Sequence, residues 1–306
     1  VSSPNVEGSD TNNDGTVDQD PSLTGDRVLT PQQVTVRGVA ISATNRDDIE
    51  TYSAAIGGGT VGVAVAAAVN VVNTETNAYI GAGASVNADQ TGAAAQQSVV
   101  VGAGNDFHHV AVAAGAGFGA VGVAPGVDVT VLNGTTSAAI DANAVVKAKD
   151  DVRVEAHASE DLLMIGMGIA AGTVGVGGGV SVLSITNDTN ASISGHVSAD
   201  GDVVVRSSDD TDIKIFSGAV GAGFVGVGAS VGVMVLDKDT EAFIADGAIV
   251  DAKGNGVGGS SGVLAGTLTG GDGANGFDTA TRHGLIVQPE SSGNMLQLGV
   301  AAGAGF

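Results

Sequence analysis

The chain has 306 residues, 50 of them glycine, no cysteine or tryptophan, and a formal net charge of −22 at pH 7. The lack of cysteine excludes a disulfide scaffold and cysteine-ligated zinc, and the eleven Lys and Arg residues are too scattered to bind nucleic acid or anionic lipid. Abundant valine and glycine favour strands over long helices, where each glycine costs about 1 kcal/mol relative to alanine, so we predict an all-β protein.

Residues 1–33 form an acidic segment with a candidate calcium loop. Oxygen-bearing side chains, a glycine and a backbone carbonyl follow the order of an EF-hand loop at Asp10, Asn12, Asp14, Gly15, Thr16 and Asp18. Pro21 replaces the usual bidentate glutamate, so Asp20 or another group must complete the shell. We therefore predict a structural calcium ion held by Asp10, Asn12, Asp14, Thr16, Asp18 and Asp20. The alternative is a flexible acidic linker.

Residues 34–254 contain four copies of one repeat. The tripeptide Val-Gly-Val begins at residues 61, 121, 174 and 225, with spacings of 60, 53 and 51 residues. An isoleucine follows nineteen residues after each start, in a Thr-x-Ala-x-Ile pattern that ends at Ile80, Ile140, Ile193 and Ile244. Invariance at every second position predicts a strand whose Ala and Ile side chains point inward and whose Thr opens the strand.

Two polar segments recur in each block, and we interpret both as turns. The first contains Asp47, Asp48 and Glu50, then Asp106, then Glu160 and Asp161, then Asp209, Asp210 and Asp212. The second reads NTETN, NGTTS, TNDTN and DKDTE. If the blocks stack, these turns form ladders along the outside of the stack. We expect a solvated charged edge there, with further cation sites as the alternative.

Equivalent sequence blocks imply equivalent environments, which favours a parallel β-solenoid. A block of about 51 residues suits two coils of roughly 20 to 30 residues, each adding about 4.8 Å. The alternative is an antiparallel, sandwich-like repeat array in which the long strand pair folds as a hairpin at GAGFG or AAGT. Valine and alanine occupy both faces of the long strand in VGVAVAAAVNVVN, which indicates a strand covered on both sides or a thin, flat body.

The remaining residues are an insertion and a partial fifth repeat. Residues 255–283 have no counterpart in the other blocks and are predicted to be a protruding Gly-rich loop. Residues 284–306 are interpreted as the start of a truncated fifth copy. His108 and His109 are the only histidine pair, and because adjacent residues in a strand point to opposite faces they are not expected to share a metal ion. The other histidines are isolated, and all five are expected at the surface. No catalytic motif stands out, so we do not expect an enzyme.

The Thr-x-Ala-x-Ile strands, the Gly/Ala/Val runs around VGV and the ADGDVVVRSS-type strands resemble the repeats of very large filamentous adhesins, of the leukotoxin-like and filamentous-haemagglutinin-like kind. The resemblance implies a right-handed β-helical shaft at the bacterial cell surface that mediates attachment. Its expected partners are other cells, surface glycans or neighbouring shafts, with no membrane insertion of this segment. A self-assembling extracellular matrix or sheath protein is the alternative, and a glycan-acting β-helix enzyme is a remote one.

Overall fold

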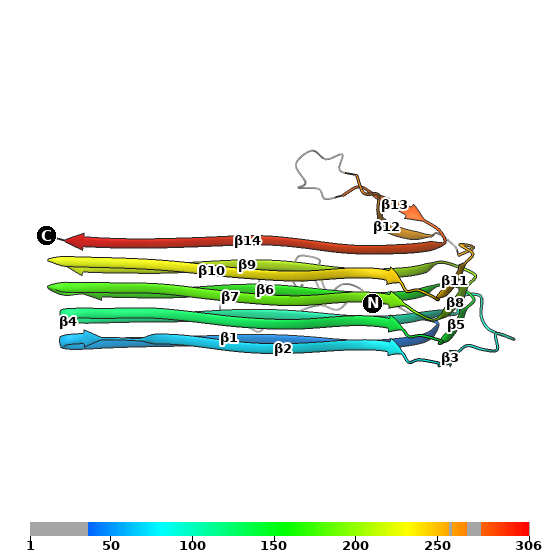
Figure 1. Cartoon of the computed structure of the whole chain (residues 1–306), viewed down its shortest axis with the longest axis horizontal. Coiled ribbons are helices and arrows are strands. Elements are labelled where there is room, and N and C mark those ends of the chain that lie inside the picture. The colour runs from blue at the N-terminus through cyan, green and yellow to red at the C-terminus, as the bar shows by residue number, and fades with distance from the viewer. Residues whose placement is uncertain (1–35, 257–258, 268–276, 306) are drawn as a thin grey trace, which may run out of the picture.

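The structure is a computed structural model that describes residues 36–256, 259–267 and 277–305 (Figure 1). Every regular element in these residues is a β-strand. The prediction of an all-β protein is therefore confirmed.

Each block follows one circuit made of a long outgoing segment, a long return segment and a short strand. In the first two circuits the chain reverses without leaving the strand, so β1 (Gly38–Val63) is followed by β2 (Ala66–Ile80), and β4 (Ser98–Ile140) contains both segments. Later circuits have separate outgoing and return strands: β6 (Val152–Ala171) with β7 (Val174–Ile193), and β9 (Val203–Gly223) with β10 (Val225–Ile244). The outgoing strand β14 (Leu285–Gly305) begins a fifth circuit.

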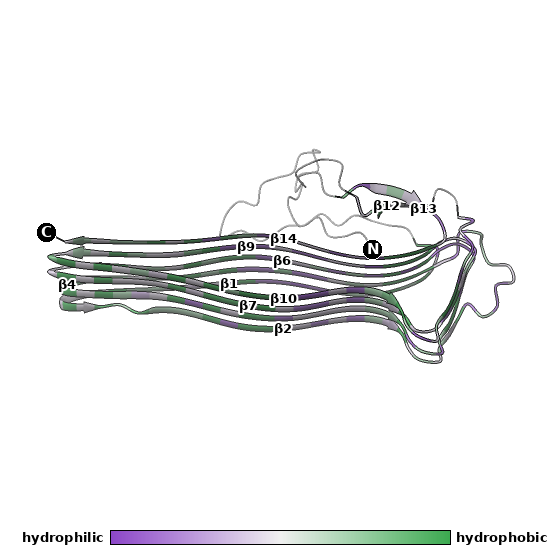
Figure 2. Cartoon of the chain, turned by 45° about the horizontal axis from the view of Figure 1, so that its top comes forward, coloured by the Kyte–Doolittle hydropathy of each residue, from purple (hydrophilic) through white to green (hydrophobic). Residues whose placement is uncertain are grey.

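The short strands lie side by side at one end of the molecule (Figure 1). They are β3 (Ser85–Val86), β5 (Val145–Ala148), β8 (His196–Ala199) and β11 (Ile249–Ala252), which form a four-stranded parallel sheet. The long strands form one large parallel sheet that folds back on itself, so that outgoing and return segments make two layers (Figure 2).

Successive circuits pair in the register that the sequence repeat predicts. Val61, Val121, Val174 and Val225 occupy one column of the sheet, and so do Ile80, Ile140, Ile193 and Ile244. The first three isoleucines are buried, and Ile244 packs against the same core. Residues at equivalent positions of the sequence repeat therefore occupy equivalent positions in the structure.

Three finer expectations are wrong. One block makes one circuit rather than two coils, because each long segment spans about twenty residues. The long strands pair only in parallel among the described residues, which contradicts the antiparallel alternative. The two polar segments are not turns: Asp106, Glu160 and Asp209 lie inside long strands, as do the NTETN-type segments.

The interior changes character along the strands. Near the short strands, valine, alanine and isoleucine side chains from all three sides of the circuit form one core. A layer of buried polar side chains follows, and the Thr of each Thr-x-Ala-x-Ile pattern points into it instead of opening a strand. A second core contains larger side chains, among them Phe107, Leu132, Met164 and Ile215.

Beyond the second core the two layers approach so closely that little more than glycine and alanine fits between them. A Cβ atom added to Gly117 would lie 2.7 Å from the backbone oxygen of Val123, and one added to Gly166 would lie 2.6 Å from that of Val180. These contacts are far inside normal van der Waals distance. We call this glycine-lined half of the molecule the thin half; it confirms that part of the protein is a thin, flat body.

Part of the insertion packs on the stack. Strands β12 (Ser260–Leu264) and β13 (Thr279–Arg282) form an antiparallel hairpin. Val263 is buried against Val204 of β9 and Ile286 of β14. The hairpin lies beside β14 in Figure 1, so the described part of residues 255–283 is an ordered attachment rather than a simple loop.

Candidate functional site: an aspartate corner, a buried charge layer and a valine face

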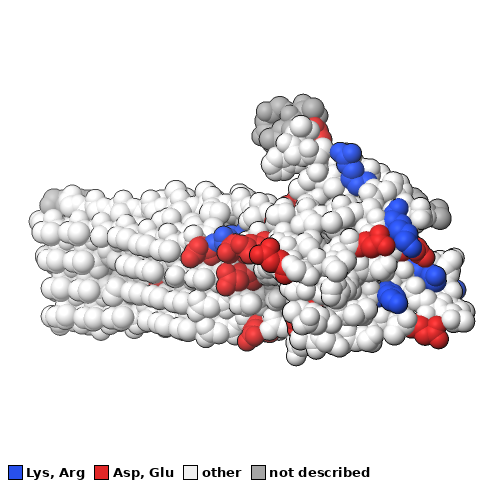
Figure 3. All heavy atoms as spheres, turned by 45° about the vertical axis from the view of Figure 1, so that its right-hand side comes forward, with Lys and Arg blue, Asp and Glu red and all other residues white. Residues whose placement is uncertain are grey.

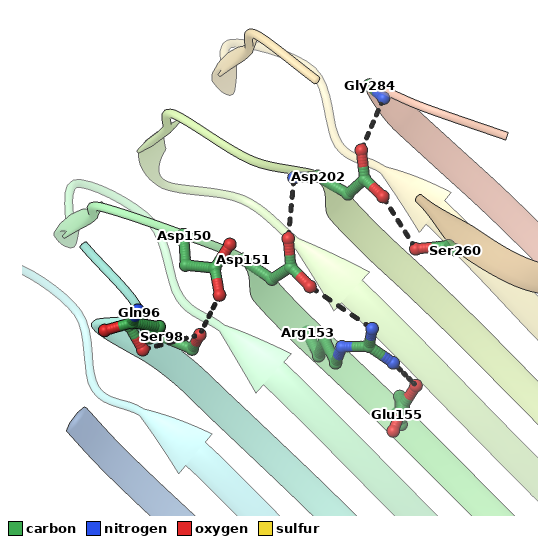
Figure 4. A network of polar contacts seen from close by, with 9 residues as sticks. All are labelled: Gln96, Ser98, Asp150, Asp151, Arg153, Glu155, Asp202, Ser260 and Gly284. Carbon is green, nitrogen blue, oxygen red and sulfur yellow. Dashed lines mark hydrogen bonds and ion pairs between the residues drawn. The ribbon is translucent and has the colours of Figure 1, made fainter. Parts of the chain in front are cut away.

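The corner between a short strand and the next outgoing strand contains a ladder of aspartates (Figure 4). The carboxylate of Asp151 accepts a hydrogen bond of 2.9 Å from the backbone N–H of Asp202, its equivalent one circuit on. Asp202 in turn accepts one of 2.7 Å from the N–H of Gly284. Each carboxylate therefore satisfies the backbone of the following circuit where the ladder of the long sheet begins.

Asp202 also fastens the insertion. Its second carboxylate oxygen accepts a hydrogen bond of 2.9 Å from the hydroxyl of Ser260, at the start of β12. Asp151 instead pairs with Arg153 at 3.2 Å, and Arg153 reaches Glu155 at 3.9 Å. The same corner position thus serves either an ion pair or the attachment of an inserted hairpin.

An open pocket of about 650 Å³ adjoins this corner. Its charged lining includes Lys149 and Lys253, which pair with Asp200 at 3.7 and 2.6 Å. The hydrogen bond from Lys253 holds the pKa of Asp200 below its usual value. Burial, with the charge of Asp151, raises the pKa of Asp150. Both lysines therefore pair with one aspartate, and the lining, which also includes Asp150, Asp151 and Asp202, has more acidic than basic side chains.

Charged side chains also lie inside the stack, in the buried polar layer. Glu160 and Asp209 are each 1% exposed, and the ammonium of Lys238 is 2.5 Å from an Asp209 oxygen. The hydroxyl of Thr211 lies 3.0 Å from Glu160 and 3.1 Å from Asp209. Burial, followed by the charge of Asp209, raises the pKa of Glu160 to about 8. At neutral pH the cluster therefore consists of the Lys238–Asp209 ion pair beside a largely protonated Glu160.

Asp128 is the most isolated carboxyl group in the described interior. It is 0% exposed, and neither of its oxygens has a hydrogen-bond partner. Burial raises its pKa to about 7. Thr130, two residues further on, bonds Nε2 of His109 at 3.0 Å, while Nδ1–H of His109 donates to the carbonyl of Ile49 at 2.9 Å. Burial lowers the pKa of His109, which is consistent with a neutral ring in this pair of bonds.

The outer surface of the return layer in the thin half is a regular array of valines. Five columns contain valine in at least three of the four circuits, for example Val61, Val121, Val174 and Val225, or Val69, Val129, Val182 and Val233. None of these side chains is buried, and Val69 is 67% exposed. We call this surface the valine face: the outward side chains of residues 61–71, 121–131, 174–184 and 225–235.

The charged side chains lie elsewhere. In Figure 3 the acidic and basic residues lie from the middle of the visible face to its right-hand end, and the left-hand end is almost free of them. In Figure 2 purple, hydrophilic stretches lie near the middle of the long strands, and green, hydrophobic stretches lie towards both of their ends. Charge and exposed apolar surface are thus separated along each strand.

Several residues singled out from the sequence lie in other places than predicted or outside the described residues. The candidate calcium ligands Asp10, Asn12, Asp14, Thr16, Asp18 and Asp20 lie outside the described residues. His109 is 0% exposed, so the expectation that all histidines are surface residues is wrong, although His108 does point to the opposite face, where it pairs with Asp161 at 3.0 Å. The acidic residues expected in solvated turns include the buried Glu160 and Asp209.

The described residues contain neither a group of three or more His, Cys, Asp or Glu side chains suited to a metal ion nor a helix long and apolar enough to cross a membrane. The fold and these sites define an all-β repeat protein in which equivalent blocks pair in parallel register. No protein-family model, curated protein or solved structure matches the chain.

Proposed function

We propose that the chain is a shaft segment of a very large secreted bacterial adhesin or surface filament, built as a right-handed parallel β-solenoid. The supporting observation is the register between circuits, which holds residue by residue from Val99 to Ile140 against the next circuit, apart from the reversal. Because the register does not shift from one circuit to the next, circuits can be added without bending the stack, and each circuit adds about 4.8 Å of length. The role of such a segment is to span distance.

The proposed shaft works outside the cell, at the bacterial surface, and its task is mechanical. Other cells or surface glycans are the expected targets of the whole protein. A structural calcium ion, held by the loop from Asp10 to Asp20, would stiffen the segment that leads into the stack. The corner aspartates support this role, since each of them ties one circuit to the next through a backbone hydrogen bond.

Electron microscopy of the parent protein tests the shaft directly. We expect a straight rod that lengthens by about 4.8 Å for each repeat block present, and that shortens by the same amount for each block removed. Attachment of the bacteria to a surface should fall as blocks are removed, while the amount of protein at the cell surface stays constant. A compact particle, or attachment independent of rod length, would contradict the proposal.

A matrix or sheath protein is the second candidate function. The observation that favours it is the valine face, because soluble monomers rarely expose apolar patches larger than a few hundred Å². The two functions differ in what a purified segment does as its concentration rises. Ordered fibres at micromolar concentration would favour the matrix protein, whereas a species of small, fixed size would favour the shaft.

A further inference from the structure

The valine face has the dimensions of a protein interface. Four circuits at about 4.8 Å and eleven residues at about 3.3 Å give a flat area of about 700 Å². A stable pair of proteins buries about 800 Å² on each partner. The outward side chains of residues 61–71, 121–131, 174–184 and 225–235 include no charged residue.

The spacing of the face restricts what can cover it. Valine columns repeat at the distance between paired strands, so grooves between circuits recur every 4.8 Å or so. Side chains from a partner interdigitate with these grooves over the whole face only if the partner has the same repeat. A second copy of this chain has that repeat by construction, and dry contacts between like side chains of stacked strands are known to be stable.

The charge distribution then fixes the orientation. With a net charge of −22, two copies repel each other wherever their acidic halves meet. A two-fold axis parallel to the stacking direction brings the two thin halves face to face and turns the acidic halves to opposite sides. The same axis keeps the circuits of both copies in step, so the contact continues along a longer stack.

We propose that the valine face binds the valine face of a second copy, about a two-fold axis parallel to the stacking direction. The assembly is a pair of laterally joined stacks in which both run in the same direction. This inference goes beyond the shaft function, because a shaft that spans distance does not require a partner.

Two variants on one strand test the contact. Val180 and Thr186 both point outward from β7, but only Val180 lies on the valine face, close to its centre. Analytical ultracentrifugation should show a dimer for the wild-type chain, strengthened by salt, which screens the remaining repulsion. Val180→Glu should raise the dissociation constant by about 100-fold or more, because the axis brings the two carboxylates together. Thr186→Glu should leave the dissociation constant within about threefold of the wild type.

Val180→Thr provides a milder check, since it keeps the β-branched shape and replaces one methyl group by a hydroxyl group. It should weaken the dimer by about tenfold with unchanged circular dichroism. A wild-type chain that stays monomeric at about 100 μM in high salt would overturn the proposal, as would a dimer that tolerates Val180→Glu. Binding of the monomer to phosphatidylcholine vesicles through this face would also overturn it, and would assign the face to lipid.

Cross-linking tests the orientation separately. The chain has no cysteine, so single substitutions give unambiguous products. Val180→Cys should react across the axis with a short bis-maleimide, whereas Thr186→Cys should not, because the axis places the two copies of residue 186 about 40 Å apart. Efficient cross-linking of Thr186→Cys without that of Val180→Cys would disprove the proposed axis.

Discussion

Two glycines of β4 differ in the space around their Cα atoms. A Cβ atom on Gly117 would collide with the carbonyl of Val123 at 2.7 Å, whereas one on Gly104 would meet nothing within 4 Å. Gly117→Ala should therefore cost about 1–3 kcal/mol of unfolding free energy, because the two layers must move apart. Gly104→Ala should be neutral or stabilising, by up to about 1 kcal/mol. Urea unfolding measures both, and equal effects would refute the close approach of the layers.

Asp128 should make stability depend on pH. Its pKa is about 7 in the folded chain and about 4 when unfolded, so its cost is absent below about pH 4, grows as the pH rises and is complete above about pH 7. Asp128→Asn should be more stable than the wild type at pH 9, by up to about 4 kcal/mol. The difference should vanish near pH 4. A constant difference across this range, measured by urea unfolding with the exposed Asp188→Asn as control, would contradict the buried carboxyl.

Lys238 balances the buried charge layer. Its ammonium contacts Asp209 and donates a hydrogen bond of 2.8 Å to the carbonyl of Ser292 in the next circuit. Lys238→Met leaves Asp209 buried without its counter-charge, so we expect a loss of about 3–5 kcal/mol. Combining it with Asp209→Asn should restore most of that loss. A double variant no more stable than Lys238→Met would show that the pair does not act as a unit.

At the scale of the strand, one block is the unit that can be removed. Deleting residues 152–202 removes one whole block. It joins Asp151 to Val203, the residue that follows Asp202, its equivalent in the next circuit, and leaves β4 to pair with β9 and β10. Because a repeat array loses only one block and one interface, this variant should keep its circular dichroism spectrum and a cooperative unfolding transition. Deleting residues 152–177, about half a block, should abolish folding.

The two deletions also separate the observed circuit from the one that block length suggested. If a block contained two coils, removal of half a block would be tolerated. Loss of structure in the half-block deletion alone is the result expected here. Equal tolerance of both deletions would contradict one circuit per block.

The register of these strands could be predicted from sequence, because the VGV and Thr-x-Ala-x-Ile anchors repeat at fixed offsets. The path within a block could not. Acidic residues such as Glu160 and Asp209 are typical of turns, and their burial depends on partners in other strands that lie 20 to 51 residues away in the chain. The reversal of the long strand near GAGFG and AAGT was also predictable, but not that glycines beside it, such as Gly117, allow the two layers to touch.

The sites were predictable to a smaller degree. Period-two alternation placed His108 and His109 on opposite faces correctly, but it cannot say which face is inside. The valine face was visible as a strand apolar on both sides, yet apolar residues on both sides equally predict a strand covered on both sides. Only the glycine contacts show that one side is the interior of the thin half.

At the scale of the whole molecule, the calcium prediction remains open to a direct test. Terbium luminescence should report an ion bound by the loop from Asp10 to Asp20, and calcium should displace it. Asp14→Ala should remove the signal, because Asp14 holds the fifth loop position, whereas Asp188→Ala on the outer surface should not. Unchanged luminescence in Asp14→Ala would leave the segment as an acidic linker.

The corner that follows each short strand is where the chain accommodates most of its added sequence. The circuits differ most in length there: residues 87–97, 149–151, 200–202 and 253–284 connect a short strand to the next long one, whereas the connections that enter the last three short strands (residues 141–144, 194–195 and 245–248) differ by only two residues. Strands on either side are locked to their neighbours, so new sequence is tolerated along this single edge. A protein built in this way can acquire or exchange inserted modules at this corner without a change in its long strands. All of these modules would project from the same side of the stack.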